Sequence, residues 1–349
     1  MATQIASTVS PGWLRSGRFD LGFIFGIAVI ALFSGLICTI EPRLFPVILV
    51  LDIWLLGYQH VISTFTRLCF DKESFRQHRF LVLQLPFIVA ACTITLAFGV
   101  GFWTLGTIYL YWQWFHYTRQ SWGVAQVYRR KSNGLVVDDE RFSLISFYLL
   151  PAAGILSRSW QQPTEFLGLE VRTIPVPGEL VVIVSAFAIA ALLVWGFQRI
   201  AMWMRGELPV AHTLYLISHF AIFATGYILI EDVTYGWLVI NIWHNAQYVA
   251  FVWLFNNQRF REGTDPKASF LSHISQRANW WKYFAVCLAL SSTVYLAIMY
   301  STSALFAEVG LPIAIIVYQT INFHHYVVDG IIWKARKKPM QKTLGLSEN

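Results

Sequence analysis

The sequence predicts an all-α membrane protein, a polytopic helical bundle of about ten transmembrane helices with both termini cytoplasmic. Hydrophobic residues make up 56% of the 349 residues and charged residues 13%, whereas typical globular proteins have about 25% charged residues. The mean hydropathy is +0.53. Apolar runs of about twenty residues, the length that crosses a bilayer, recur along the chain. This composition excludes a series of soluble domains.

Ten segments approach the length of a membrane span, and short polar loops separate them. They are 19–40, 44–66, 80–101, 102–128, 142–157, 180–203, 208–230, 234–256, 281–300 and 309–333. No small-residue cleavage site follows the first segment, so it is interpreted as a retained helix and not as a signal peptide. We expect one integral-membrane domain, 1–349, with a longer external segment at 158–179.

The charges of the loops predict the orientation of these spans. If both termini lie on the same side, 22 of the 26 basic residues also lie on that side. Cytoplasmic loops are enriched in Lys and Arg. Segments 1–18 and 257–279 and the basic tail 334–349 are therefore expected on the cytoplasmic side of a bacterial inner membrane or an equivalent membrane. The net charge of +7 then reflects topology and contact with membrane lipids, and nucleic acid is not an expected partner.

Two common kinds of cofactor site are not indicated. Cys38, Cys69, Cys92 and Cys287 form no CxxC pair, so neither a disulfide framework nor a thiolate metal site is expected. No GxGxxG or GxxxxGK[ST] motif occurs, so the chain shows no nucleotide or flavin domain of its own. Any electron-transfer chemistry would therefore need a separate electron donor.

Histidines are prominent among the ionisable residues inside the predicted spans. Six of the nine lie in the middle or the cytoplasmic half of five spans, namely His60, His116, His219, His244, His324 and His325. Ionisable residues inside a membrane usually mark function. A single buried histidine is typically a core residue, but six at a similar depth favour a metal or haem site.

The spacing of the polar residues supports ligation, because residues three or four apart share a helix face. His325 and Asp329 are four apart, and Asp52 lies eight residues before His60. Polar stripes accompany two further histidines, namely Asn241, His244, Gln247 and Tyr248 in one span and Gln113, His116 and Gln120 in another. Each stripe alone is equally typical of hydrogen bonding between helices.

The predicted metal ligands are therefore the six histidines together with Asp52 and Asp329. Asp329 has an alternative interpretation as an interfacial acid paired with Lys334 or Arg336. Tyr248 and Arg119 are the candidate catalytic residues, and Arg119 is expected to pair with a buried carboxylate or to hold an anionic head group.

This gathering of imidazoles resembles the site of the histidine-rich integral-membrane di-iron oxygenases, which include fatty-acid desaturases and hydroxylases and alkane monooxygenases. The HxxxH and HxxHH boxes of that class are not matched, and His324–His325 is the nearest approach to one. The resemblance implies a dinuclear iron centre that activates dioxygen. It also implies a lipid or other hydrophobic small molecule as substrate for this metal-dependent oxidoreductase.

The histidines also allow other interpretations. His244-x-x-x-Tyr248, followed by His324–His325, is similar to the ligand pattern of haem–copper oxidases, so haem and copper are alternatives to iron. Zinc also accepts imidazole and carboxylate ligands. The alternative functions are a non-catalytic haem-binding protein, a metal or proton transporter, and a zinc-dependent lipid hydrolase.

Overall fold

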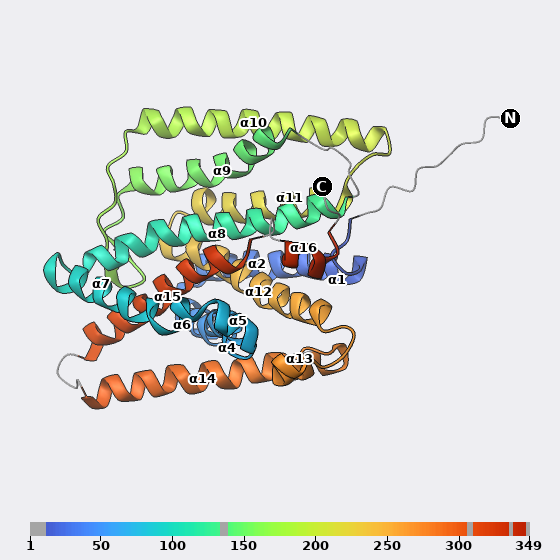
Figure 1. Cartoon of the computed structure of the whole chain (residues 1–349). Helices are drawn as coiled ribbons and strands as arrows, with labels where there is room; N and C mark the ends of the chain where they lie inside the picture. The colour runs from blue at the N-terminus through green and yellow to red at the C-terminus, as the bar shows by residue number, and fades with distance from the viewer. Residues whose placement is uncertain (1–11, 133–138, 306–309, 335–337, 347–349) are drawn as a thin grey trace.

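The computed structural model describes residues 12–132, 139–305, 310–334 and 338–346. These residues are almost entirely helical (Figure 1), which confirms the all-α class. The strands among them are β1, Glu165–Phe166, and β2, Leu169–Glu170, which pair as a small antiparallel ribbon. The ribbon lies in the predicted external segment 158–179.

Seven helical segments of the described residues are long and apolar enough to span a membrane. They are Gly17–Ile40 (α1, η1 and α2), Pro42–Cys69 (η2, α3, η3 and α4), Glu140–Gln161 (α9), Gly178–Met204 (α10), Val210–Leu229 (α11 and η4), Val233–Arg259 (α12) and Arg277–Thr302 (η6 and most of α14). The other helices are α5 Lys72–Gln77, α6 Arg79–Leu83, α7 Leu85–Gly99, α8 Trp103–Lys131, η5 Pro266–Ala268, α13 Ser269–Ile274, α15 Gly310–Ile332 and α16 Lys338–Leu344. The full range of α14 is Trp280–Leu305.

A helix therefore lies at each of the ten predicted positions, but three of them are not among the seven apolar segments. Segment 80–101 is divided into α6 and α7. Pro86 lies in the first turn of α7, where a proline costs no helical hydrogen bond. The other two are α8 and α15, which carry many of the polar residues of the candidate site. The count of ten membrane spans consequently remains a prediction.

Helix α12 is the centre of the bundle. Within its apolar stretch 89% of the residues are buried, against 11% for α10 and 17% for the segment that includes α14. Helix α12 packs against α2, α4, α8 and α11, whereas α10 and α14 lie at opposite edges of the molecule (Figure 1). The edge helices expose large apolar side chains such as Phe187, Phe197 and Leu296, as expected of faces in contact with lipid.

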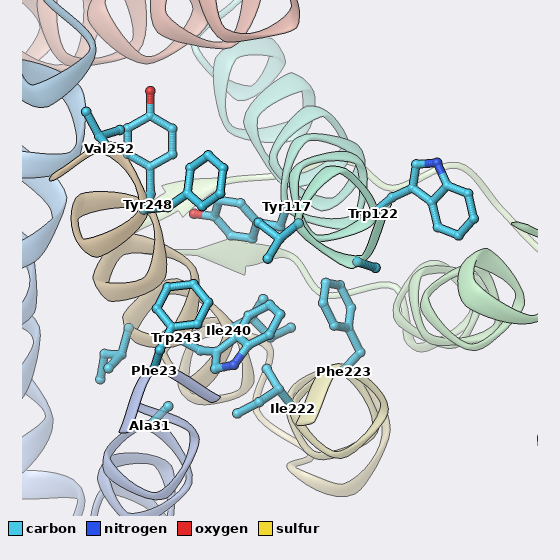
Figure 2. Packing of buried hydrophobic residues seen from close by; sticks show 14 of the residues in the cluster. Phe23, Ala31, Tyr117, Trp122, Ile222, Phe223, Ile240, Trp243, Tyr248 and Val252 are labelled. Atoms are coloured by element: carbon cyan, nitrogen blue, oxygen red, sulfur yellow. The ribbon is translucent and has the colours of Figure 1, made fainter. Parts of the chain in front are cut away.

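Close contacts between helices depend on small residues at particular points. Gly35 of α2 faces Val239 of α12, and a Cβ atom at position 35 would overlap the valine side chain. Large apolar side chains fill the remaining space around α12, as Phe223 and Trp243 do where they pack edge to face with centroids 6.1 Å apart (Figure 2). Small residues at helix contacts are typical of membrane bundles, so these positions fix how close α2 and α12 approach.

The predicted external segment begins later than expected, because α9 continues to Gln161. Arg158 is fully buried within α9 and donates to the carbonyl oxygens of Gly226, Ile230 and Glu231 around the end of η4. A cation at a helix C-terminus satisfies carbonyls that have no helical donor. Arg158 is therefore a structural residue that joins α9 to the η4 end.

Candidate metal centre

Four of the predicted ligands come together between three helices. His60 lies on α4, His116 on α8, and His325 and Asp329 on α15. Each offers one ligand atom, and the four atoms lie within 4.8 Å of one another. All four side chains are buried. Three imidazoles and one carboxylate in this space form a ligand set that a single metal ion can use.

The local helix geometry explains this convergence. His325 and Asp329 are four residues apart, so they share one face of α15, and His325 Nε2 lies 3.4 Å from Asp329 Oδ2. On the other side, η3 (Ile53–Gly57) is a π-helical turn immediately before α4. Such turns change the direction in which later side chains point and occur frequently at functional sites. In the structure His60 Nε2 points at His325 Nε2, 2.6 Å away.

Two observations test whether these residues fit a metal ion. Tetrahedral ligands with metal–nitrogen bonds of about 2.0–2.1 Å lie about 3.3 Å apart, so an ion would separate the 2.6 Å His60–His325 pair by about 0.7 Å. His116 Nε2 is buried and has no hydrogen-bond partner among the described residues. A buried nitrogen without a partner is costly, and coordination would satisfy it. The side chains therefore fit an ion after a small displacement.

Asp329 is held by a network of hydrogen bonds. Its Oδ1 accepts from Tyr248 Oη at 2.8 Å and from Thr64 Oγ1 at 3.1 Å. Its Oδ2 accepts from Gln120 Nε2 at 3.4 Å. Tyr248 Oη also contacts Thr64 Oγ1 and accepts from Trp333 Nε1 at 2.7 Å. These contacts fix one carboxylate oxygen and leave the other facing His325.

The position of Asp329 differs from that of an interfacial acid. Its side chain is buried, and it forms no ion pair with Lys334 in the part of the chain that the structure describes. Arg336, the other suggested partner, lies outside the described residues. The carboxylate is therefore part of the buried centre.

His244 of α12 lies next to this group without belonging to the four-ligand set. Its ring centroid is 4.8 Å from that of His60 and 5.1 Å from that of His116. It also packs on Tyr117 at 4.1 Å. His244 Nε2 has no partner among the described residues. A fourth imidazole is thus available beside the centre.

Asp52 does not reach the four-ligand group. Its Oδ2 accepts from Asn241 Nδ2 at 2.5 Å, and Asn241 Oδ1 accepts from Tyr117 Oη at 2.5 Å. The prediction that Asp52 is a ligand is therefore not supported. Asp52 instead connects to the centre through Asn241, which lines a cavity of about 30 Å³ beside His60, His244 and His325. A cavity of this size holds about one water molecule.

His219 and His324 are also outside the group. His219 Nδ1 lies 3.0 Å from Ser121 Oγ, and its Nε2 lies 3.3 Å from the Phe147 carbonyl oxygen. His324 Nε2 lies 2.7 Å from the Leu81 carbonyl oxygen and its ring stacks on Phe65. These rings tie neighbouring helices together, so the structure gives them a packing role in place of the predicted ligation.

Arg119 lies one turn beyond His116 on α8, but its side chain is exposed. Its guanidinium lies near the hydroxyl of Tyr148, and among the described residues Arg119 forms no ion pair with a buried carboxylate, so the expected pair is not observed. Arg119 lines a second, larger cavity of about 390 Å³, and His116, His244, Tyr248 and Asp329 line the same cavity. The centre is therefore open to a pocket of substrate size.

Two residues of the site were not found from the sequence. Trp333 donates to Tyr248, and the guanidinium of Arg67 stacks over the Trp333 ring at 4.1 Å and the Phe255 ring at 4.5 Å. The signal was present in the spacing, because Trp333 follows Asp329 by four residues and Arg67 follows Thr64 by three. Both residues support the network that holds Asp329.

Comparison of the chain with protein-family models, with curated proteins and with solved structures found no match.

Proposed function

We propose that the protein is a membrane-embedded, metal-dependent oxidoreductase of the dioxygen-activating type, acting on a lipid or another hydrophobic small molecule. The observation that carries this proposal is the buried group of His60, His116, His325 and Asp329, with ligand atoms within 4.8 Å, at the end of a cavity of about 390 Å³. Imidazoles with one carboxylate suit iron, as in non-haem oxygenases. When bound, iron supplies the redox chemistry that activates dioxygen toward a C–H bond.

The geometry favours one ion over the dinuclear centre that the sequence suggested. The described residues provide one set of four ligands. A second ion would need His244 and at least one further ligand, and Asp52 is held away by Asn241. We therefore propose one iron ion per chain, with His244 next to it.

In this proposal, residues around the centre orient the metal ligands and shield them from water, and a separate protein supplies electrons. Thr64, Tyr248 and Trp333 orient Asp329, and burial excludes bulk water from the imidazoles. Tyr248 is a positioning residue in this scheme, because its hydroxyl donates to the carboxylate. Electrons would come from a separate donor, since no nucleotide or flavin motif occurs in the chain.

Haem fits the site less well than iron, and zinc would imply a different function. A haem held by two histidines places them on opposite faces of a macrocycle, whereas the 2.6 Å contact of His60 and His325 leaves no space for one between them. Zinc suits the same four ligands, and a zinc-activated water would make the protein a hydrolase. Zinc is thus the rival that an experiment must separate from iron.

For the placement in the membrane, we propose ten spans with both termini cytoplasmic, in a bacterial inner membrane or an equivalent membrane. The support is the alternation of basic loops together with a helix at each of the ten positions. The metal centre then lies toward the cytoplasmic half, where a soluble electron donor can approach.

Metal analysis and an absorption spectrum of the purified full-length protein test the proposal. The expected result is about one iron per chain and no Soret band. A Soret band would show haem and contradict the proposed centre. The protein is purified anaerobically and then supplied with Fe²⁺. If it still contains one zinc ion per chain and no iron, the proposed oxidoreductase function is wrong and a zinc-dependent hydrolase takes its place. Absence of any bound metal would refute both.

A further inference from the structure

The cavity of about 390 Å³ extends well beyond the metal centre. Its lining residues on α8 run from Trp112 to Arg130. Several of them are three or four residues apart and share one helix face, namely Trp112, Phe115, Arg119, Gly123, Val127 and Arg130. At 1.5 Å per residue these positions cover about 27 Å along the axis. Facing stripes come from α12 and α15, and Met340 and Leu344 of α16 close the side. The pocket is therefore long and suits an extended molecule.

The two ends of this cavity differ in chemistry. Toward the centre it is lined by aromatic side chains such as Trp112, Phe115 and Tyr326. Arg130 and Lys334 line the cavity near the last turn of α8 and just after α15. Glu140 is the acidic residue of the lining apart from Asp329, and it is exposed at the start of α9. Among the described residues, the lining near these two helix ends therefore contains two cations, Arg130 and Lys334, and one acid, Glu140.

We propose that this cavity binds an extended amphiphile with an anionic head, a carboxylate or a phosphate. Arg130 and Lys334 hold the head, and the apolar chain lies along α8 toward His116. Arg130 is 14 residues from His116, or about 21 Å along the helix. The apolar chain, and not the head, therefore lies next to His116. This last consequence rests on the proposed function, whereas the binding itself does not.

Photo-labelling of the full-length protein in phosphatidylcholine nanodiscs tests the proposal. The probe is palmitic acid with a diazirine near the end of the chain. We expect labelled residues on the cavity faces of α8, α12 and α15, and at least a tenfold stronger competition by palmitate than by its methyl ester. Equal competition by the ester, or labelling confined to lipid-facing α10 and α14, would overturn the proposal.

Two further competitors identify the head. If monopalmitoyl phosphate competes better than palmitate, the head is a phosphate ester, and the reverse order identifies a carboxylate. Inorganic phosphate alone should not compete, because the chain supplies the apolar contacts. Competition by inorganic phosphate at the same concentration would show an anion site without a chain and contradict the amphiphile.

Variants locate the binding and control for folding. Gly123 lines the cavity and a Cβ there meets nothing within 4 Å, so Gly123→Leu should fill the pocket without a clash and reduce labelling about tenfold. Gly196→Leu on α10 is the matched control, since Gly196 also has open space but lies outside the lining. Unchanged labelling of Gly123→Leu would contradict the proposal.

Charge removal gives a second, independent test. Arg130→Gln with Lys334→Gln should abolish the preference for palmitate over the methyl ester, whereas Lys72→Gln with Arg76→Gln on α5 should retain it. Retention of the preference in the first pair would overturn the role of the two cations. If that pair fails to fold, the ester comparison in the unmodified protein still decides.

The same labelling separates this inference from the proposed function. His325→Ala should lose metal and retain the cavity. If the unmodified protein is labelled in the cavity but binds no metal, the amphiphile site stands and the proposed oxidoreductase function is refuted. Bound iron without labelling of the cavity would do the opposite.

Discussion

His60 Nε2 and His325 Nε2 lie 2.6 Å apart, although 265 residues separate them in the chain. Their contact joins α4 to α15 at the point where α8 contributes His116. Two imidazole nitrogens directed at each other can share one proton or one metal ion, and Asp329 Oδ2 lies 3.4 Å from the same His325 nitrogen. A carboxylate beside paired imidazoles favours the metal ion.

The pair His324 and His325 gives a matched test of the ligand set. His325→Ala should lower the affinity for iron by more than about tenfold, because even residues that only orient ligands cost about 10–100-fold. His324→Ala should retain iron, since His324 bonds to the Leu81 carbonyl on another face of α15. Metal titration of both purified variants measures the difference. Equal iron binding by the two variants would remove His325 from the ligands.

A second prediction concerns Asp52, whose carboxylate is bonded to Asn241 and is absent from the four-ligand group. Asp52→Asn should keep the iron content of the unmodified protein, since the substitution changes charge but not size. Metal content per chain, measured beside His325→Ala as the positive control, checks this. A loss of iron as large as that of His325→Ala would return Asp52 to the ligands.

The sequence predicted the helix positions well, because each long apolar run can satisfy its backbone in a membrane only as a helix. It predicted the site only in part. Depth along a span follows from counting residues, but the direction of a side chain depends on rotation of the helix. His324 and His325 share a depth and point about 100° apart, and only His325 faces the centre.

Asp52 and His60 show a second limit of the sequence. Eight residues make about 2.2 turns of α-helix, so the two side chains would point about 80° apart on a regular helix. The π-helical turn η3 lies between them and alters that relation. The run Ile53–Gly57 contains no proline, and its one glycine does not by itself predict a π-helical turn. The separation of Asp52 from the histidines therefore depends on packing between helices.

A third prediction tests the packing of α2 on α12. Gly35→Leu would overlap Val239, and overpacking of this kind costs about 1–3 kcal/mol, so the thermal unfolding temperature in detergent should fall. Gly26→Leu is the control in the same helical segment, because a Cβ at Gly26 meets nothing within 4 Å. An unchanged unfolding temperature for Gly35→Leu would mean that α2 does not approach α12 this closely.

A fourth prediction concerns topology. Tags placed at both termini and in loop 257–279 should be accessible from the cytoplasmic side, because basic residues are concentrated in these segments. A tag in 158–179, which contains the β1–β2 ribbon, should be accessible only from the opposite side. Protease digestion of intact and inverted vesicles distinguishes the two sides. Digestion of both loops from one side would contradict ten spans.

The last prediction separates a ligand from the residues that position it. Asp329→Asn keeps the size of the side chain and removes its charge. An exposed ion pair would lose at most about 1 kcal/mol, but Asp329 is buried and bonded to Tyr248 and Thr64. We therefore expect the affinity for iron to fall by about 100-fold or more, beyond the usual cost of losing a residue that only orients a ligand.

Tyr248→Phe supplies the comparison. It removes the donor to Asp329 and leaves Trp333 Nε1 without its acceptor, so stability should fall by about 1–3 kcal/mol. The affinity for iron should fall by about 10–100-fold, less than in Asp329→Asn. Tyr300→Phe, at an exposed position on α14, should change neither quantity. Iron titration and thermal unfolding of the three variants measure the order of their iron affinities and stabilities. Full iron binding by Asp329→Asn would make the carboxylate a structural group and leave the three histidines as the only ligands of the proposed set.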